Sequence, residues 1–317
     1  MLWFMQQARI MADIHEKYLG GMVGSALGDA IGELAFSHPT KETLCAHLEQ
    51  LETYRYTDDT AMSIGIAESI LKAGCLDELD LGETFRANFK REPWRGYASG
   101  PPTVFSMVME LGITYAEAAQ RLFGRSGSFG NGSAMRVVPV GLVFHKTPDL
   151  YEMARVSAVV THAHPLGIDG AAVQSKAVAL AVQHDPNDAF PSDAFVQDIL
   201  GFVRTSEMRE KIREVGDLIS SRAHPSVAAQ RLGRTVAVHE SLPFALYSFL
   251  LYPKSFEDCL WCAILNGGDR DTLGAMACAI SGAYLGIKAI PNSWIEKLEN
   301  RSYIEQLASQ LAEMTIS

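Results

Sequence analysis

The residues best suited to chemistry form two short acidic clusters that lie more than two hundred positions apart. Residues 57–60 read TDDT and open an apolar-periodic segment, and residues 269–272 read DRDT and follow a Gly-Gly pair. Each cluster places carboxylates and hydroxyls within four residues. Carboxylate and other oxygen ligands are those that hard divalent cations prefer.

Two interpretations fit these clusters. As helix N-caps, their side chains would satisfy free N–H groups and the positive end of the helix dipole. As one joint site, four carboxylates would crowd a single cleft, where like charges cannot all stay ionised unless a divalent metal neutralises them. The spacing alone leaves both interpretations open.

The elements that would position the clusters are two helices with small residues at every fourth position. One runs from about residue 16 to 31 and the other from about 274 to 286. Their stripes are Gly20, Gly24, Gly28, Gly32 and Gly274, Cys278, Gly282, Gly286. Small residues on one helix face let another backbone approach closely, so we predict that these two helices pack together.

Two acidic residues accompany the first of these helices. Asp29 lies inside it, where an acid needs a hydrogen-bonding partner, so a structural role such as capping a neighbouring loop is at least as reasonable as catalysis. Glu33 follows at the end of the helix and is a freer candidate for a cleft residue.

Two glycine-rich loops are candidates for ligand binding. Residues 95–102 contain two prolines that stop a preceding helix, and residues 124–133 run into an expected helix at 134–138. Successive Gly and Ser leave N–H groups free to face an anion, and a helix start adds its dipole. A flexible linker is the alternative. We favour ligand binding, although the spacing matches neither a Rossmann nor a P-loop motif.

The length and composition predict a folded protein with a substantial core. The chain has 317 residues, 48% hydrophobic content and a net charge of −10, which argues against broad nucleic-acid binding. Five scattered cysteines predict a reduced, cytoplasmic protein, and residues 1–7 are too short an apolar stretch for a signal peptide. No apolar run reaches membrane-spanning length.

Because helical periodicity recurs and strand patterns are nearly absent, we predict one all-α domain over 1–317 with a dozen or more helices.

Taken together, these motifs resemble the ADP-ribosylglycohydrolase family of the dinitrogenase-reductase-activating type. The matching segments are 28–32 (GDAIG), 57–62 (TDDTAM), 130–136 (GNGSAMR), 161–162 (TH) and 267–272 (GGDRDT). Residues 95–100 (RGYASG) and 127–132 (GSFGNG) look most like the branch that hydrolyses serine-linked ADP-ribose and poly(ADP-ribose). The family resemblance implies an all-α fold with two Mg²⁺ ions in a central cleft, and Mn²⁺ is an alternative because oxygen ligands accept both.

By motif match, the resemblance implies roles for individual residues. The metal ligands would be Thr57, Asp58, Asp59, Asp269, Asp271 and Thr272. The catalytic candidates are Asp269, Asp59 and Glu33. The substrate-binding residues would be Gly96, Tyr97, Ser99, Gly100, Gly127, Ser128, Phe129, Gly130, Asn131, Gly132 and His162.

The implied activity is Mg²⁺-dependent hydrolysis of the ribose C1″ bond in ADP-ribosylated protein side chains, with serine the favoured acceptor. Poly(ADP-ribose) and O-acetyl-ADP-ribose are further candidate substrates, and an arginine-specific hydrolase is the alternative. One departure favours a different class, a non-catalytic ADP-ribose-binding module. The family usually has a Glu that gates the metal site four residues after the Gly-Asp-x-x-Gly motif, and here that position is Phe36. We expect a monomer that binds ADP-ribose and ADP-ribosylated proteins, not nucleic acid or membranes.

Overall fold

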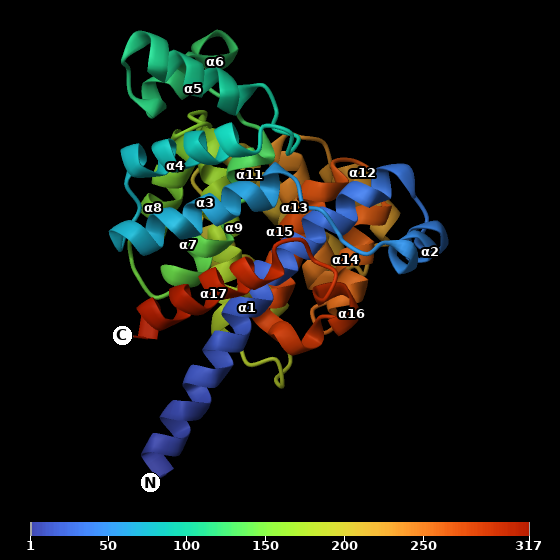
Figure 1. Ribbon diagram of the computed structural model, residues 1–317. Coiled ribbons are helices and arrows are strands. Elements are labelled where there is room, and N and C mark those ends of the chain that lie inside the picture. The colour runs from blue at the N-terminus through green and yellow to red at the C-terminus, as the bar shows by residue number, and fades with distance from the viewer. Residues whose placement is uncertain (1, 317) are drawn as a thin grey trace.

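Two helices in close backbone contact run through the centre of the protein (Figure 1). The computed structural model describes residues 2–316, and the two helices are α1 (Leu2–Ser37) and α15 (Arg270–Leu285). A Cβ atom at Gly28 would lie 2.1 Å from the carbonyl oxygen of Gly274, and one at Gly20 would lie 2.3 Å from that of Gly282. The small-residue stripes therefore do pack together, as the sequence predicted.

The rest of the described chain is also helical, with seventeen α-helices and two short 3₁₀ helices within residues 2–316. Between α1 and α9 the helices are α2 (Lys41–Gln50), α3 (Asp58–Ala73), α4 (Glu78–Arg91), α5 (Gly100–Leu111), α6 (Tyr115–Arg125), η1 (Asn131–Ser133), α7 (Val138–Val143) and α8 (Leu150–Val159). The others are α9 (Pro165–Gln183), α10 (Ser192–Phe202), α11 (Ser206–Ser220), α12 (Pro225–Leu232), α13 (Val238–Leu251), α14 (Phe256–Leu265), η2 (Ile287–Ala289), α16 (Asn292–Ile295) and α17 (Arg301–Ile316). These residues form no β-sheet, only two isolated β-bridges. The all-α prediction is confirmed.

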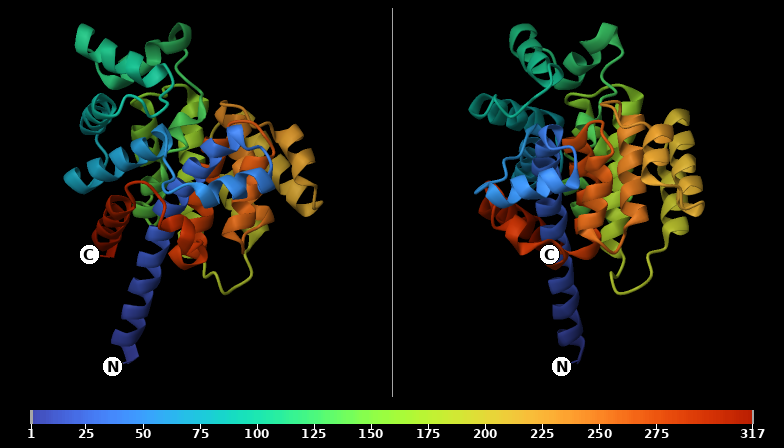
Figure 2. Two further views of the ribbon diagram at one scale, coloured as in Figure 1. Left: turned by 45° about the vertical axis from the view of Figure 1, so that its right-hand side comes forward. Right: turned by 90° about the vertical axis from the view of Figure 1, so that its right-hand side faces the viewer.

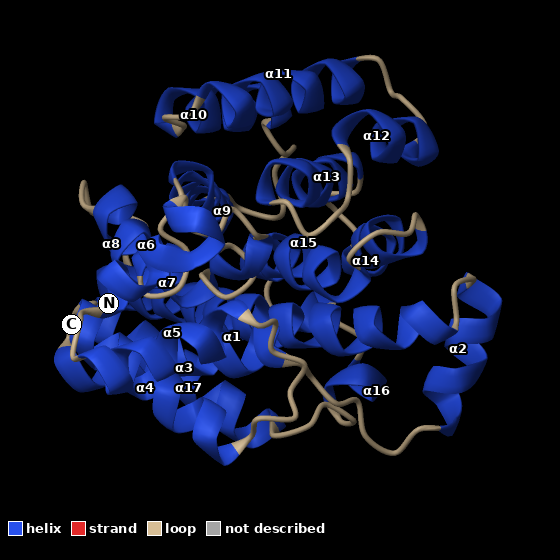
Figure 3. Ribbon diagram, turned by 90° about the horizontal axis from the view of Figure 1, so that it is seen from above, coloured by secondary structure: helices blue, strands red, loops and turns tan. Residues whose placement is uncertain are grey.

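The helices form layers around one hydrophobic core (Figure 3). Helices α10, α11 and α12 lie outermost and cover α9 and α13, which in turn pack on α15. On the other side of α15 lie α1 and then α3 and α17. Helices α5 and α6 project from the body in both views of Figure 2.

Two helix boundaries differ from the sequence-based expectation. Helix α5 begins at Gly100 and carries Pro101 in its first turn, so a proline expected only to end a helix also opens one. The helix expected at 134–138 does not form. The 3₁₀ helix η1 precedes a turn there, and α7 starts only at Val138, because Pro139 has no N–H to continue an earlier helix but fits a first turn.

No helix within residues 2–316 is both long enough and apolar enough to cross a membrane.

Candidate active site

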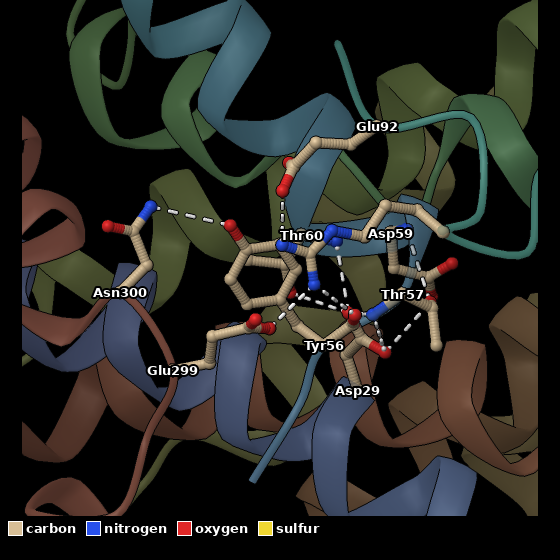
Figure 4. A network of polar contacts seen from close by, with 9 residues as sticks. Asp29, Tyr56, Thr57, Asp59, Thr60, Glu92, Glu299 and Asn300 are labelled. Atoms are coloured by element: carbon tan, nitrogen blue, oxygen red, sulfur yellow. Dashed lines mark hydrogen bonds and ion pairs between the residues drawn. The ribbon is translucent and has the colours of Figure 1, made fainter. Parts of the chain in front are cut away.

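A carboxylate on α1 fixes the start of α3 (Figure 4). Asp29 is fully buried and accepts hydrogen bonds from the backbone N–H of Thr57 and from its hydroxyl, at 3.0 and 2.9 Å. The backbone N–H and hydroxyl of Thr60 donate to it at 3.1 and 2.6 Å. Burial raises the pKa of Asp29 to about 6, although these hydrogen bonds oppose the rise. Asp29 therefore has the structural capping role that its position in the sequence indicated.

The two acidic clusters meet at the N-terminal ends of α3 and α15. Asp58 and Asp59 line the same cavity of about 460 Å³ as Asp269, Asp271 and Thr272. The hydroxyl of Thr272 donates to Oδ2 of Asp59 at 3.4 Å, which joins the clusters directly. The close contact of α1 with α15 makes this meeting possible, because α1 holds α3 through Asp29 and holds α15 through the glycine stripe.

The electrostatics of the cleft follow from burial and crowding. Burial, with smaller contributions from neighbouring carboxylates, raises the pKa of Asp58 to about 7 and that of Asp271 to about 8. The pKa of Asp59 is raised well above its ordinary value by burial and by the charges of Asp29 and Asp271. Oδ1 of Asp59 is buried without a hydrogen-bond partner. The cavity lining thus contains four carboxylates and neither Lys nor Arg, so no cation among the lining residues neutralises these oxygen atoms.

The acidic side chains of the cavity are not arranged as a complete metal-binding site. Among residues 2–316 no group of three or more His, Cys, Asp or Glu side chains is arranged to hold a metal ion. The donor chemistry nevertheless fits a hard cation. Four carboxylates and a hydroxyl face one cavity, and one buried carboxylate oxygen lacks a partner.

Most of the substrate-binding residues expected from the sequence line this cavity. They are Gly96, Ser99, Gly100, Gly127, Ser128, Phe129, Gly130, Asn131, Gly132 and His162. The volume lies within the range of small-molecule sites, about 300–1,000 Å³.

Three expected site residues lie outside the cavity lining. Thr57 is the N-cap residue of α3, and its hydroxyl donates to Asp29. The Tyr97 ring turns inward and packs edge-on against Phe89, with ring centroids 5.1 Å apart. Glu33 is exposed near the end of α1, within electrostatic reach of Asp271, whose pKa its charge helps to raise. Their roles in metal binding, substrate binding and catalysis stay predictions.

The glycine-rich loop is held in place by a distant segment. The N–H of Asn131 donates to the carbonyl oxygen of Val236 at 2.8 Å, and the N–H of Val238 donates to that of Phe129 at 3.1 Å. The N–H of Gly130 is bonded to the Ser128 hydroxyl. Within the described part of the chain, the N–H groups of Ser128, Phe129 and Gly132 have no partner and remain free for an anion.

Sequence reasoning missed several residues of the cleft. Val236 and Ala237 line it, but no local signal links them to the glycine-rich loop. Met62 and Met135 add apolar surface. The sequence indicates Arg136 only as part of a motif; it does not line the cavity, and the structure buries it completely. A single cation beside an apolar run could have signalled this.

Asn131 was expected to bind substrate, but the structure gives it an additional contact. Its Nδ2 donates to Oδ2 of Asp269 at 2.7 Å and to the Ser241 hydroxyl at 3.2 Å. The amide therefore holds the Asp269 carboxylate in a fixed orientation. Arg270, between the two aspartates, donates to the carbonyl oxygen of Ile264 and lies outside the cavity lining.

The fold and the site define an all-α protein with a carboxylate-lined cavity, and comparison with known proteins shows which family this is. A model of the ADP-ribosylglycohydrolase family matches residues 11–317, so the chain belongs to that family of hydrolases, which act on ADP-ribose linkages.

Within the family, the chain resembles the ADP-ribosylhydrolase ARH3 branch. It is 32% identical to the Homo sapiens protein over an alignment of 340 positions, gaps included, that covers 93% of this chain and 92% of that one. It is 33% identical to the Danio rerio protein over an alignment of 349 positions, gaps included, that covers 97% of this chain and 93% of that one. ADP-ribosyl-[dinitrogen reductase] glycohydrolase of Rhodospirillum rubrum is 26% identical over 90% of this chain and 91% of its own.

A solved structure shares the fold. It is described as an ADP-ribosylglycohydrolase-related protein complex and superposes with a TM-score of 0.69 at 23% identity, over 96% of this chain and 99% of that one.

Proposed function

We propose that the protein is a Mg²⁺-dependent hydrolase that cleaves the ribose C1″ bond of ADP-ribosylated side chains, with serine the favoured acceptor. The observation that carries the proposal is the meeting of both acidic clusters and the glycine-rich loop on one cavity. The similarity to ADP-ribosylhydrolase ARH3 supports it. Poly(ADP-ribose) and O-acetyl-ADP-ribose are further candidate substrates.

The acidic residues would hold a pair of Mg²⁺ ions, with Mn²⁺ as a substitute. The ligands would be Thr57, Asp58, Asp59, Asp269, Asp271 and Thr272. The unpartnered Oδ1 of Asp59 and the raised pKa values of Asp58 and Asp271 support this set, because a bound dication would relieve both. When bound, such ions supply Lewis-acid stabilisation of charge and orientation of ribose hydroxyls.

The protein's own groups would bind the substrate and position the attacking water. Asn131 fixes one oxygen of Asp269, and the other has no protein partner within residues 2–316, so it is free to orient or deprotonate water. Asp59 is the second candidate for that role. The free N–H groups of Ser128, Phe129 and Gly132 would bind the diphosphate, and the Phe129 ring would pack against adenine.

A non-catalytic ADP-ribose-binding module is the second candidate function. Phe36, at the position where the family usually has a gating Glu, is 48% exposed and does not line the cavity. Glu33 would have to replace that Glu from a different turn of α1. If it cannot, the glycine-rich loop would still bind ADP-ribose.

One assay separates these alternatives. The purified protein is incubated with serine- and arginine-linked ADP-ribosyl peptides, with Mg²⁺ or with EDTA. We expect Mg²⁺-dependent release of ADP-ribose, faster from serine. Faster release of ADP-ribose from the arginine-linked peptide would show that arginine, and not serine, is the preferred acceptor. Binding of ADP-ribose without release from any substrate would establish the binding module.

The ligand assignment has its own test. Asp58→Ala and Asp271→Ala should each abolish Mg²⁺-dependent turnover, because each removes a carboxylate from the cavity. Circular dichroism should show that both variants stay helical. Full turnover in both would refute their assignment as metal ligands.

A further inference from the structure

Behind the glycine-rich loop, three buried polar side chains form a hydrogen-bonded series from Arg136 through Thr161 to His162. We propose that Arg136 and Thr161 are positioning residues that hold His162 in its Nε2–H tautomer, so that a neutral imidazole presents a hydrogen-bond donor to the cleft. The tautomer follows from the geometry alone. Its use in binding substrate rests on the proposed function.

The series begins with a cation that can only donate. The Arg136 side chain is fully buried, and its Nη2 donates to the carbonyl oxygen of Ser157 at 2.8 Å and to Oγ1 of Thr161 at 2.9 Å. Its guanidinium carbon lies 4.7 Å from the centroid of the Phe85 ring. Because a guanidinium has no acceptor, the direction of the bond to Thr161 is fixed.

The bond from Arg136 also fixes the direction of the hydrogen bond between Thr161 and His162. Its hydroxyl is fully buried, and its two hydrogen-bonding neighbours among the described residues are Nη2 of Arg136 and Nδ1 of His162, the latter at 2.8 Å. The hydroxyl accepts from Arg136, so its own proton can be satisfied only by donating to His162 Nδ1. A proton on Nδ1 would leave that hydroxyl proton buried and unpaired, which is costly. Nδ1 is therefore the acceptor, and the ring proton is on Nε2.

The Nε2 atom faces the substrate loop. His162 lines the cavity, and its Nε2 has no hydrogen-bond partner within residues 2–316. A Cβ atom at Gly132 would lie 3.0 Å from Nε2 and 2.9 Å from Cε1, and one at Gly130 would lie 3.5 Å from Nε2. The glycines thus leave room for the imidazole edge beside the loop.

The charge state of His162 matches this role. Burial lowers the pKa of His162 to about 3, with a smaller contribution from the nearby charge of Arg136. The ring stays neutral at physiological pH, so it donates a hydrogen bond but does not supply a proton. We infer that Nε2–H donates to an oxygen of bound ADP-ribose, close to the free N–H groups of the loop.

The tautomer can be measured without any enzyme assay. The full chain is labelled with ¹⁵N-histidine, and long-range ¹H–¹⁵N spectra are recorded between about pH 6 and 8, the range in which unperturbed histidines titrate. The His162 signal is assigned by its loss in His162→Gln. We expect a protonated Nε2 and an unprotonated Nδ1 that do not titrate. A protonated Nδ1 would overturn the proposal.

Matched variants test what holds the tautomer. Thr161→Val removes the hydroxyl at nearly constant volume and should give a mixture of tautomers, whereas Thr161→Ser keeps the hydroxyl and should preserve the wild-type signal. His164 is an internal control, because its Nδ1 accepts from the backbone N–H of Leu166 at 3.1 Å, independently of Arg136. Its signal should be unchanged in both variants. An unchanged His162 signal in Thr161→Val would overturn the positioning role.

Calorimetric titration with ADP-ribose and Mg²⁺ tests whether His162 Nε2–H contributes to substrate binding. Because one well-oriented hydrogen bond is lost, we expect the affinity of Thr161→Val for ADP-ribose to be about three- to tenfold weaker than that of the wild type. The affinity of Thr161→Ser should be close to the wild-type value. Equal affinity in Thr161→Val despite a shifted tautomer would overturn the role of Nε2–H in binding. Absence of binding by the wild-type protein would refute the proposed function, while the spectra would still decide the tautomer.

Discussion

The contact between α1 and α15 gives a sharp test of how the fold supports the cleft. Replacing Gly28 by Ala would place a Cβ atom 2.1 Å from the carbonyl oxygen of Gly274 and 2.4 Å from its carbonyl carbon. Real Cβ atoms essentially never approach a heavy atom more closely than 3.0 Å, so the helices would have to separate by about 0.9 Å. Because both contacts are to backbone, no side-chain rotation can relieve them.

The expected size of the effect combines two opposing contributions. Alanine has a better helix propensity than glycine by about 1 kcal/mol, which favours the variant. Overpacking a rigid interior typically costs about 1–3 kcal/mol and occasionally more, and here the obstruction is a backbone carbonyl. With the cost at about 3 kcal/mol, the upper end of that range, because a backbone carbonyl cannot rotate away, we expect a net loss of about 2 kcal/mol. This corresponds to a fall of about 3 °C in the midpoint of thermal unfolding for a chain of this size.

Differential scanning calorimetry of Gly28→Ala beside Gly201→Ala is the assay. Gly201 is also helical, in α10, but a Cβ atom there would meet nothing within 4 Å. The control should be as stable as wild type or slightly more stable, since only helix propensity changes. Separation of α1 from α15 should also weaken Mg²⁺ binding, because α15 carries Asp271. A Gly28→Ala midpoint equal to that of Gly201→Ala would refute the close-packing argument.

Three further predictions concern the cleft. Asp29→Ala should destabilise the protein by about 1–3 kcal/mol, because buried donors of α3 lose their acceptor, and an unchanged melting temperature would contradict the capping role. Burial raises the pKa of Asp271 to about 8, so between about pH 4 and pH 8 the folded metal-free protein binds more protons than the unfolded chain. Its melting temperature in EDTA should therefore fall as the pH rises to about 8. Added Mg²⁺ should reverse this loss of stability. A melting temperature that rises with pH in EDTA would contradict this. Asn131→Ala frees the Asp269 carboxylate and should lower Mg²⁺ affinity or turnover about 10- to 100-fold, as measured by titration and steady-state kinetics, whereas wild-type values would show that the amide does not matter.

The sequence was most informative where one element carries its own signal. Spacing-four glycines predicted the contact of α1 with α15, and helical periodicity predicted the all-α class. The burial of Asp29 inside a small-residue helix indicated a capping role, which the structure assigns to the start of α3. These inferences succeed because helix formation and helix packing depend on side chains repeated along one segment.

The two interpretations of the acidic clusters, as caps or as one site, could be separated only in three dimensions. Thr57 does cap α3, since its hydroxyl accepts from the backbone N–H of Asp59 at 3.4 Å. Asp269 is the N-cap residue of α15 but makes no side-chain capping bond, and its carboxylate is held by Asn131. Capping and cleft formation therefore coexist at the first cluster, which spacing alone could not reveal.

The sequence by itself determined the helical class, the central helix pair and the chemical nature of the acidic clusters, because each depends on residues close together in one segment. The tertiary structure alone decided that Val236 supports the glycine-rich loop, that Arg136 lies buried behind His162, and that the carboxylates share one cavity. Hydrogen bonds and charges act through space, so their partners, and the pKa values that result, are set by segments far apart in the chain.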